Sequence, residues 1–141
     1  MTHISYQLTS NFAASAQLTY DNMRTYYQHY GVDWQHAHII EQIKGLQNWD
    51  IVINGQVIGA IRLAFDDAGC YLRDLQVDAG YQNKGIGEKA LLECQRLAKS
   101  AGVTALRMRV FKISPAHHLY TRMGFGVDSE EERFYYMSLK L

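Results

Sequence analysis

The sequence YLRDLQVDAGYQNKGIGEKALLECQRLAKS, residues 71–100, decides how this chain folds. Its first part predicts a strand that ends at Val77. A polar turn, QNKGIG, follows at residues 82–87, and its glycines predict that a helix begins near Gly85 or Gly87. An apolar stripe at helical spacing then continues to the end of the stretch. The stretch therefore predicts a strand, a short turn and a long helix.

The start of this helix has the properties of an anion site. A helix N-terminus offers about four unpaired backbone N–H groups and the positive end of the helix dipole. Gly85 and Gly87 carry no Cβ, so an anion can approach the backbone closely. The turn therefore predicts binding of a phosphate or pyrophosphate. It lacks the glycine-lysine-serine/threonine spacing of a P-loop and the third glycine of a dinucleotide fingerprint, which disfavours those two classes of nucleotide-binding protein.

The composition predicts an ordinary cytoplasmic domain. The chain has 141 residues, the length of a single domain over 1–141, and an apolar fraction of 48% that can form a core. Basic and acidic residues both number 14, so no charge excess indicates nucleic acid or a membrane surface as a partner. Cys70 and Cys94 are expected to be buried free thiols, as in a reducing compartment. Neither a signal peptide nor a long apolar span is visible.

The rest of the chain mixes strands and helices without strict βαβ alternation, which predicts an α+β fold with a mixed sheet. Asn54-Gly55 between two apolar runs predicts a tight hairpin. Asp33 is expected to cap a helix from Trp34 to Lys44. The remaining expected strands are residues 4–9, 49–53, 57–65, 105–111, 125–129 and 134–139, and the remaining expected helices are residues 13–30 and 115–123.

Two motifs point to a known family. The pattern Gln82-x-x-Gly85-x-Gly87, preceded by Leu75-x-Val77 on the strand, resembles the acetyl-CoA-binding motif of the GNAT N-acetyltransferase superfamily. Downstream, PAHHLYTRMGF at residues 115–125 is similar to that family's Ala-x-x-Leu-Tyr-x-x-x-Gly-Phe element. The motifs follow one another in the family's order, and the resemblance covers about Trp49 to Leu141. The chain is therefore identified as a member of the GNAT superfamily.

The resemblance implies a three-layer fold: a mixed, mostly antiparallel sheet of about seven strands with about four helices on both faces. It also implies that two central strands part near Val77 and Arg109, and that the thioester of acetyl-CoA enters the gap. Acetyl-CoA would be the co-substrate, and no metal would be needed. The residues expected at the cofactor are Leu75, Gln76, Val77, Gln82, Asn83, Lys84, Gly85, Ile86, Gly87, Glu88 and Tyr120.

For catalysis, the resemblance assigns Tyr120 as the acid that protonates the departing thiolate. Family members often carry a glutamate base at the position of Tyr71 or Arg73, but neither residue has a carboxylate. Asp74 lies on the same strand, and alternation points it to the opposite face unless a bulge intervenes. His117 and His118, a water relay that ends at Tyr71, and an acceptor amine that arrives partly neutral stay open as alternatives.

The first helices and the last hairpin are expected to bind the acceptor. Tyr26, Tyr30 and Asp33 suit a small cationic amine, because aromatic faces and one carboxylate attract a cation. Arg73 is included in this expected substrate site. Tyr20, Met23 and Tyr27 are expected in the core, since they share helical spacing. One further departure from the family is Ile113, which replaces a common asparagine three residues before Ala116.

The sequence therefore predicts an N-acetyltransferase that moves an acetyl group directly to a primary amine of a small molecule or peptide. The alternative is a catalytically silent module that binds acetyl-CoA as a sensor or interaction domain, which the missing strand carboxylate favours and Tyr120 disfavours. Neither nucleic acid nor a membrane is expected as a partner. The protein is expected to be a monomer, or a homodimer that pairs through an exposed strand at the sheet edge.

Overall fold

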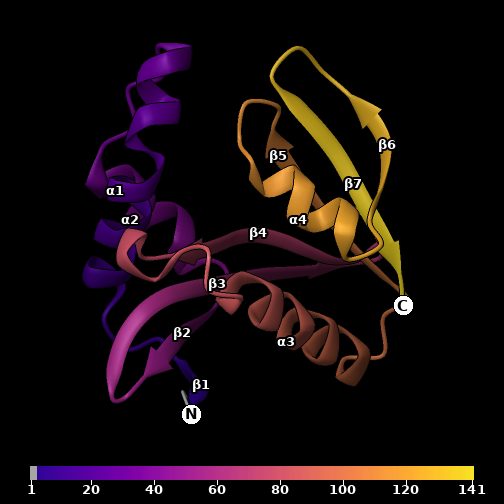
Figure 1. The fold of residues 1–141 in the computed structure, drawn as a ribbon, viewed down its shortest axis with the longest axis horizontal. Coiled ribbons are helices and arrows are strands. Elements are labelled where there is room, and N and C mark those ends of the chain that lie inside the picture. The colour runs from indigo at the N-terminus through magenta and orange to yellow at the C-terminus, as the bar shows by residue number, and fades with distance from the viewer. Residues whose placement is uncertain (1–2) are drawn as a thin grey trace.

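A computed structural model describes residues 3–141, and these form one mixed sheet with helices on both faces (Figure 1). The strands are β1 (Ile4–Leu8), β2 (Gln47–Ile53), β3 (Gln56–Asp66), β4 (Gly69–Val77), β5 (Ala105–Phe111), β6 (Gly126–Glu130) and β7 (Phe134–Lys140). The helices are α1 (Phe12–Tyr30), α2 (His36–Lys44), α3 (Ile86–Ser100), α4 (Ala116–Arg122) and the short 3₁₀ helix η1 (Ala79–Tyr81).

The sheet has the strand order β1-β2-β3-β4-β5-β7-β6. All neighbouring strands run antiparallel except β4 and β5, which are parallel. The β2–β3 hairpin turns at Asn54 and Gly55, whose φ angles of 52° and 78° both lie in the left-handed region that this two-residue turn requires. The α+β class and the mixed sheet predicted from the sequence are confirmed.

Two separate apolar clusters hold the helices to the sheet. The larger one joins the sheet to α3 and α4 and includes Leu91 of α3 and Tyr120 of α4. The smaller one contains Ala16 of α1 and Ile39 and Ile43 of α2. The helices α1 and α2 therefore cover one face and α3 and α4 the other (Figure 1), the three-layer arrangement that the sequence predicted.

The central strands β4 and β5 separate part of the way along their length. Their pairing covers three positions, of which Leu72 with Met108 is the last. Beyond it β5 continues to pair with β7 on its other side, while β4 continues to pair with β3. The two strands therefore part at Arg73 and Arg109, and the predicted splayed pair is confirmed.

A β-bulge in β4 changes which side chains share a face. Arg62 of β3 pairs with Asp74, but the next residue, Leu63, pairs with Leu72, so Arg73 is one extra residue in β4. An extra residue reverses the strict alternation beyond it. The bulge therefore brings Asp74 onto the face that also carries Tyr71. Without a bulge, strand alternation would have pointed Asp74 to the opposite face.

The second helix begins later than predicted. The structure starts α2 at His36 with Gln35 as its N-cap, so the predicted start at Trp34 with Asp33 as cap is wrong. The backbone N–H of Gln35 donates to Nδ1 of His38 at 3.4 Å, which satisfies the cap without Asp33. The Trp34 ring stacks on Tyr27 with a centroid separation of 6.2 Å, and this packing holds the segment before the helix.

Among residues 3–141, none of the helices is both long and apolar enough to cross a membrane.

Candidate active site

A cleft of about 620 Å³ opens where β4 and β5 part. Its walls come from α1, α2, the second half of β4, the turn before α3, the end of β5 and α4. The cleft thus joins the start of α3 to the gap between the strands, and it contains most of the site residues predicted from the sequence.

One end of the cleft is the turn before α3. Within the described range 3–141, no hydrogen bond uses the backbone N–H groups of residues 82–88. The φ angles of Asn83 and Gly85 are 61° and 79°, and Gly85 is the N-cap of α3. A Cβ at Gly87 would lie 3.3 Å from Cδ2 of Leu119, so this glycine lets α3 approach α4 closely. The turn therefore presents a set of free amides at a helix N-terminus.

The side chains of the same turn contribute little to this end of the cleft. The Lys84 ammonium lies 5.6 Å from the centre of the Tyr81 ring, and Lys84 does not line the cleft. Ile86 is buried in the larger apolar cluster. Glu88 lies in the first turn of α3, where a carboxylate interacts favourably with the helix dipole. The groups that this turn offers to a ligand are thus mainly its backbone N–H groups.

The last residues of β4 are tied to α1 and to the turn. The Val77 carbonyl accepts hydrogen bonds from Nδ2 of Asn22 and from Nε2 of Gln82, both at 2.9 Å. The same Asn22 amide donates to Oε1 of Gln76 at 3.2 Å. Leu75, Gln76 and Val77 all line the cleft, on the stretch of β4 that no longer pairs with β5. Their side facing β5 can therefore offer backbone groups to an extended ligand.

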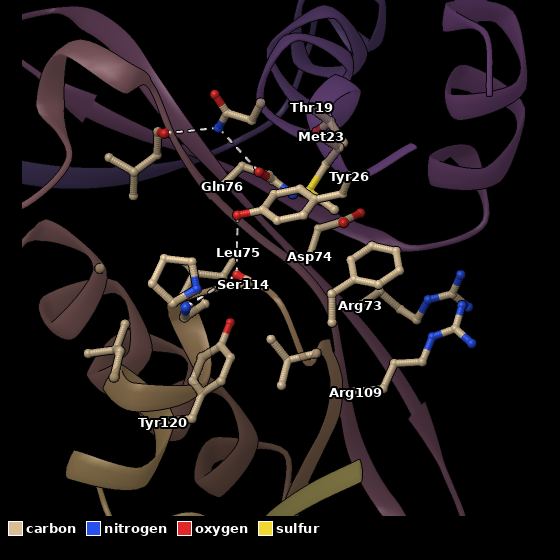
Figure 2. Close-up of a pocket in the computed structure, with 18 of the residues that line it drawn as sticks. Thr19, Met23, Tyr26, Arg73, Asp74, Leu75, Gln76, Arg109, Ser114 and Tyr120 are labelled. Atoms are coloured by element: carbon tan, nitrogen blue, oxygen red, sulfur yellow. Dashed lines mark hydrogen bonds between the residues drawn. The ribbon is translucent and has the colours of Figure 1, made fainter. Parts of the chain in front are cut away.

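Tyr120 of α4 lies in the cleft below the gap (Figure 2). Tyr120 is 8% exposed, and its ring packs against Phe125 with a centroid separation of 5.9 Å. Burial raises the pKa of the Tyr120 phenol, and the nearby Cys94 thiol and Asp74 carboxyl raise it further. The phenol therefore stays protonated at neutral pH and can donate a proton into the cleft.

Asp74 also lines the cleft and is held by a buried arginine. Nη1 of Arg62 lies 3.1 Å from Oδ2 of Asp74, and the Arg62 side chain is fully buried. Arg62 also donates to Ser15 and Thr19 of α1 and to Asn48 of β2. Within residues 3–141, Oδ1 of Asp74 has no hydrogen-bond partner, so one carboxylate oxygen is fixed and the other is available as an acceptor.

The other proton acceptors considered from the sequence differ in position. Tyr71 lines the cleft, and burial raises its pKa against the opposing effects of Arg109 and Arg73. His118 also lines the cleft. The His117 ring packs against the His118 ring, with 4.0 Å between their centres. Burial lowers the pKa of His117. Tyr71, Asp74 and His118 therefore share the cleft with Tyr120, and His117 lies outside it.

The expected acceptor residues are only partly brought together. Tyr26 lines the cleft, and its ring stacks on Phe111 at 5.7 Å. Tyr30 also stacks on Phe111, with a centroid separation of 5.0 Å, but Tyr30 does not line the cleft. Asp33 lies outside the cleft, beside a separate shallow hollow with Glu41. The expected carboxylate for a cationic acceptor is thus missing from the cleft among the residues described.

Several residues of the cleft were not singled out from the sequence. Met23, which was expected in the core, lines the cleft. Ser114 connects the two sides of the gap, because its Oγ accepts from the Tyr26 hydroxyl at 3.5 Å and from the Ala116 N–H at 3.2 Å (Figure 2). Ile113, which replaces the family's common asparagine, is 45% exposed, and the hydrogen bonds to Tyr26 and Ala116 come from its neighbour Ser114. Further cleft residues outside the predicted site include Asn22, Arg109, Phe111 and Arg133.

In the part of the chain that the structure covers, no three His, Cys, Asp or Glu side chains are grouped so that they could hold a metal ion.

This arrangement of a splayed strand pair, a free helix N-terminus and a buried tyrosine is typical of acyl-CoA-dependent transferases. A sequence model of the acetyltransferase (GNAT) family matches residues 16–125, which is most of the chain. The chain therefore belongs to the GNAT acetyltransferase family. A comparison with curated proteins finds no match.

Solved structures share the whole fold at low sequence identity. PaiA N-acetyltransferase from Thermoplasma acidophilum, solved with coenzyme A, matches with a TM-score of 0.74 at 19% identity over 99% of both chains. IAA acetyltransferase from Bacillus cereus matches with a TM-score of 0.78 at 19% identity over 99% of this chain and 100% of the other. An acetyltransferase from Streptococcus agalactiae gives a TM-score of 0.78 at 18% identity over 98% of both.

Proposed function

We propose that this protein transfers the acetyl group of acetyl-CoA directly to a primary amine of a small molecule or peptide. The observation that carries the proposal is the continuous cleft, which runs from the free amides of residues 82–88 to the phenol of Tyr120. A single domain over 1–141, acting in the cytoplasm as a monomer or homodimer, is part of the same proposal.

The diphosphate of coenzyme A would bind at the start of α3. Its charge is stabilised by the backbone N–H groups of residues 82–88 and by the helix dipole. The coenzyme A complex of the PaiA relative supports this choice of ligand. The amide-rich pantetheine arm would then extend along Leu75 to Val77, where β4 no longer pairs with β5, and would form hydrogen bonds to β4 in place of that strand.

The thioester would lie in the gap between β4 and β5. The amine nitrogen attacks the carbonyl carbon, and a backbone N–H of β4 stabilises the oxyanion of the tetrahedral intermediate. The C–S bond then breaks, and the Tyr120 hydroxyl donates its proton to the departing thiolate. The proton lost by the amine goes to Asp74, whose Oδ1 is free while Arg62 holds Oδ2.

Replacing Gly85 with valine is expected to weaken coenzyme A binding about tenfold or more. The φ angle of 79° disfavours a β-branched residue, so the turn must shift and its amides lose their alignment. Isothermal titration with coenzyme A measures the effect. Gly102→Val is the matched control, because Gly102 has a φ of 80° and similarly open surroundings but lies beyond the other end of α3. Equal weakening in both variants would contradict the assigned phosphate site.

Replacing Asp74 with asparagine is expected to lower kcat at least tenfold, with little change in coenzyme A affinity, because asparagine keeps the shape but cannot accept the proton. Tyr71→Phe, measured in the same assay, is expected to change kcat less than threefold. The reverse order of the two effects would assign the base role to a relay that ends at Tyr71. Steady-state release of the coenzyme A thiol, measured over a pH series, gives kcat for both variants.

Thiol release from acetyl-CoA over a panel of amines tests the proposed function itself. The alternative is a catalytically silent module that binds acetyl-CoA as a sensor, and the Arg62 partner that occupies one oxygen of Asp74 is the observation in its favour. Coenzyme A binding without turnover for any amine would establish that alternative. Turnover that depends on the added amine supports the transferase.

A further inference from the structure

Three arginines meet at the acceptor side of the cleft. Arg73 follows the last paired residue of β4, and Arg109 follows its partner on β5, so the two stand opposite one another where the strands part. Figure 2 shows their side chains next to each other beyond Asp74. Arg133, which lies just before β7, lines the same cleft. Three positive charges from three separate segments therefore converge at one opening.

Among residues 3–141, none of these arginines has a carboxylate partner. The ion pairs formed within residues 3–141 involve other residues, and the hydrogen bonds of that range leave the side-chain nitrogens of Arg73, Arg109 and Arg133 unused. The Asp74 carboxylate keeps one oxygen free, but its single negative charge is already offset by the guanidinium of Arg62. Like charges repel when they are brought together without a counterion, so this opening favours an anion.

Aromatic rings position two of the three guanidinium groups. Arg109 lies 4.3 Å from the centre of the Phe134 ring, and Arg133 lies 5.0 Å from the centre of the Tyr30 ring. Phe111 stacks between these rings, at 4.6 Å from Phe134 and 5.0 Å from Tyr30. A guanidinium group that rests on an aromatic face keeps its N–H edge free for a ligand. The arginines are therefore oriented as well as gathered.

The coenzyme A diphosphate does not neutralise this charge. Arg73 and Val77 are four residues apart on β4, a separation of roughly 13 Å in a strand. This exceeds the distance of about 8 Å over which exposed charges interact at physiological salt. The reacting thioester would lie between the phosphate-binding turn and the arginines, so the arginines face the acceptor.

We propose that the acceptor amine also carries an oxyanion, a carboxylate or a phosphoryl group, which Arg73, Arg109 and Arg133 bind. The proposal rests on the transferase function proposed above and specifies its substrate class. Arginine pairs with both kinds of oxyanion through two parallel hydrogen bonds. The rings of Tyr26 and Phe111 would contact the carbon skeleton of the acceptor. An oxyanion-bearing acceptor replaces the acceptor predicted from the sequence, a cationic amine held by Asp33, because Asp33 lies outside the cleft.

The test is equilibrium binding to the protein saturated with coenzyme A. Isothermal titration compares matched pairs: α-amino acids of varied side chain with their amides, and aminoalkylphosphonates with the corresponding amino alcohols. We expect at least one oxyanion-bearing member to bind tenfold or more tightly than its partner without the oxyanion, and the two series to show which oxyanion is preferred. Arg109→Gln should remove this preference, whereas Arg96→Gln, an exposed α3 arginine paired with Glu93, should retain it.

Turnover separates this inference from the proposed function. With the preferred acceptor, Arg109→Gln should raise KM about tenfold and change kcat less than threefold, because the arginine positions the acceptor and takes no part in proton transfer. Equal binding within every pair, or an unchanged preference in Arg109→Gln, would overturn the inference even if amines without an oxyanion are acetylated. A clear oxyanion preference in binding without any acetyl transfer would support the inference and refute the transferase function alone.

Discussion

Replacing Tyr120 with phenylalanine is expected to lower kcat for acetyl transfer about 100- to 1,000-fold, the usual contribution of a positioned general acid. The variant removes one hydroxyl and keeps the ring that packs against Phe125. Affinity for acetyl-CoA should change little, because the proposed phosphate contacts come from residues 82–88. The measurement is steady-state thiol release together with titration of coenzyme A.

The pH profile of the native protein provides a second test of the same role. Burial raises the pKa of Tyr120, so the phenol keeps its proton as the pH rises above neutrality. Loss of this acid should therefore not reduce kcat between about pH 9 and pH 10.5, where an unperturbed phenol would lose its proton. Tyr6→Phe, at a tyrosine of β1 outside the cleft, is the matched control and should keep full activity. A tenfold or smaller loss in Tyr120→Phe would contradict the acid role.

Replacing Arg62 with methionine is expected to lower the free energy of unfolding by about 3 kcal/mol or more. Arg62 is fully buried and makes five hydrogen bonds, which connect β2, α1 and Asp74. Methionine fills similar space but leaves these partners without their donor, and each buried group that stays unpaired is costly. Urea unfolding followed by circular dichroism measures the change.

The matched control is Arg107→Met. Arg107 of β5 also pairs with an aspartate, Asp66 at the end of β3, but that carboxylate is 58% exposed. Water replaces such a surface partner easily, so the control should lose far less stability. A similar loss in both variants would show that the Arg62 network adds no more than a surface ion pair. Arg62→Met should also reduce kcat, because Asp74 then has no partner that fixes its orientation.

Local chemistry explains which parts of the fold the sequence predicts well. Asn54-Gly55 requires two left-handed residues, and the structure forms the tight hairpin there. Gly85 ends the polar turn and caps α3 within a residue of the predicted start. Neighbouring residues alone determine these features. The start of α2 is the exception. Trp34 packs on Tyr27 instead of beginning the helix, and α2 begins at His36, after the predicted cap Asp33.

The sequence by itself determined the family and located the proposed phosphate-binding turn and the candidate acid Tyr120, because each is encoded in a short run of adjacent residues. Only the tertiary structure decided which side chains share the cleft. The bulge at Arg73 depends on pairing with β3, and the Arg62 contact to Asp74 spans two strands. The meeting of Arg109 and Arg133 depends in the same way on β5 and β7 lying side by side. Such contacts follow from strand order and register, which no local pattern specifies.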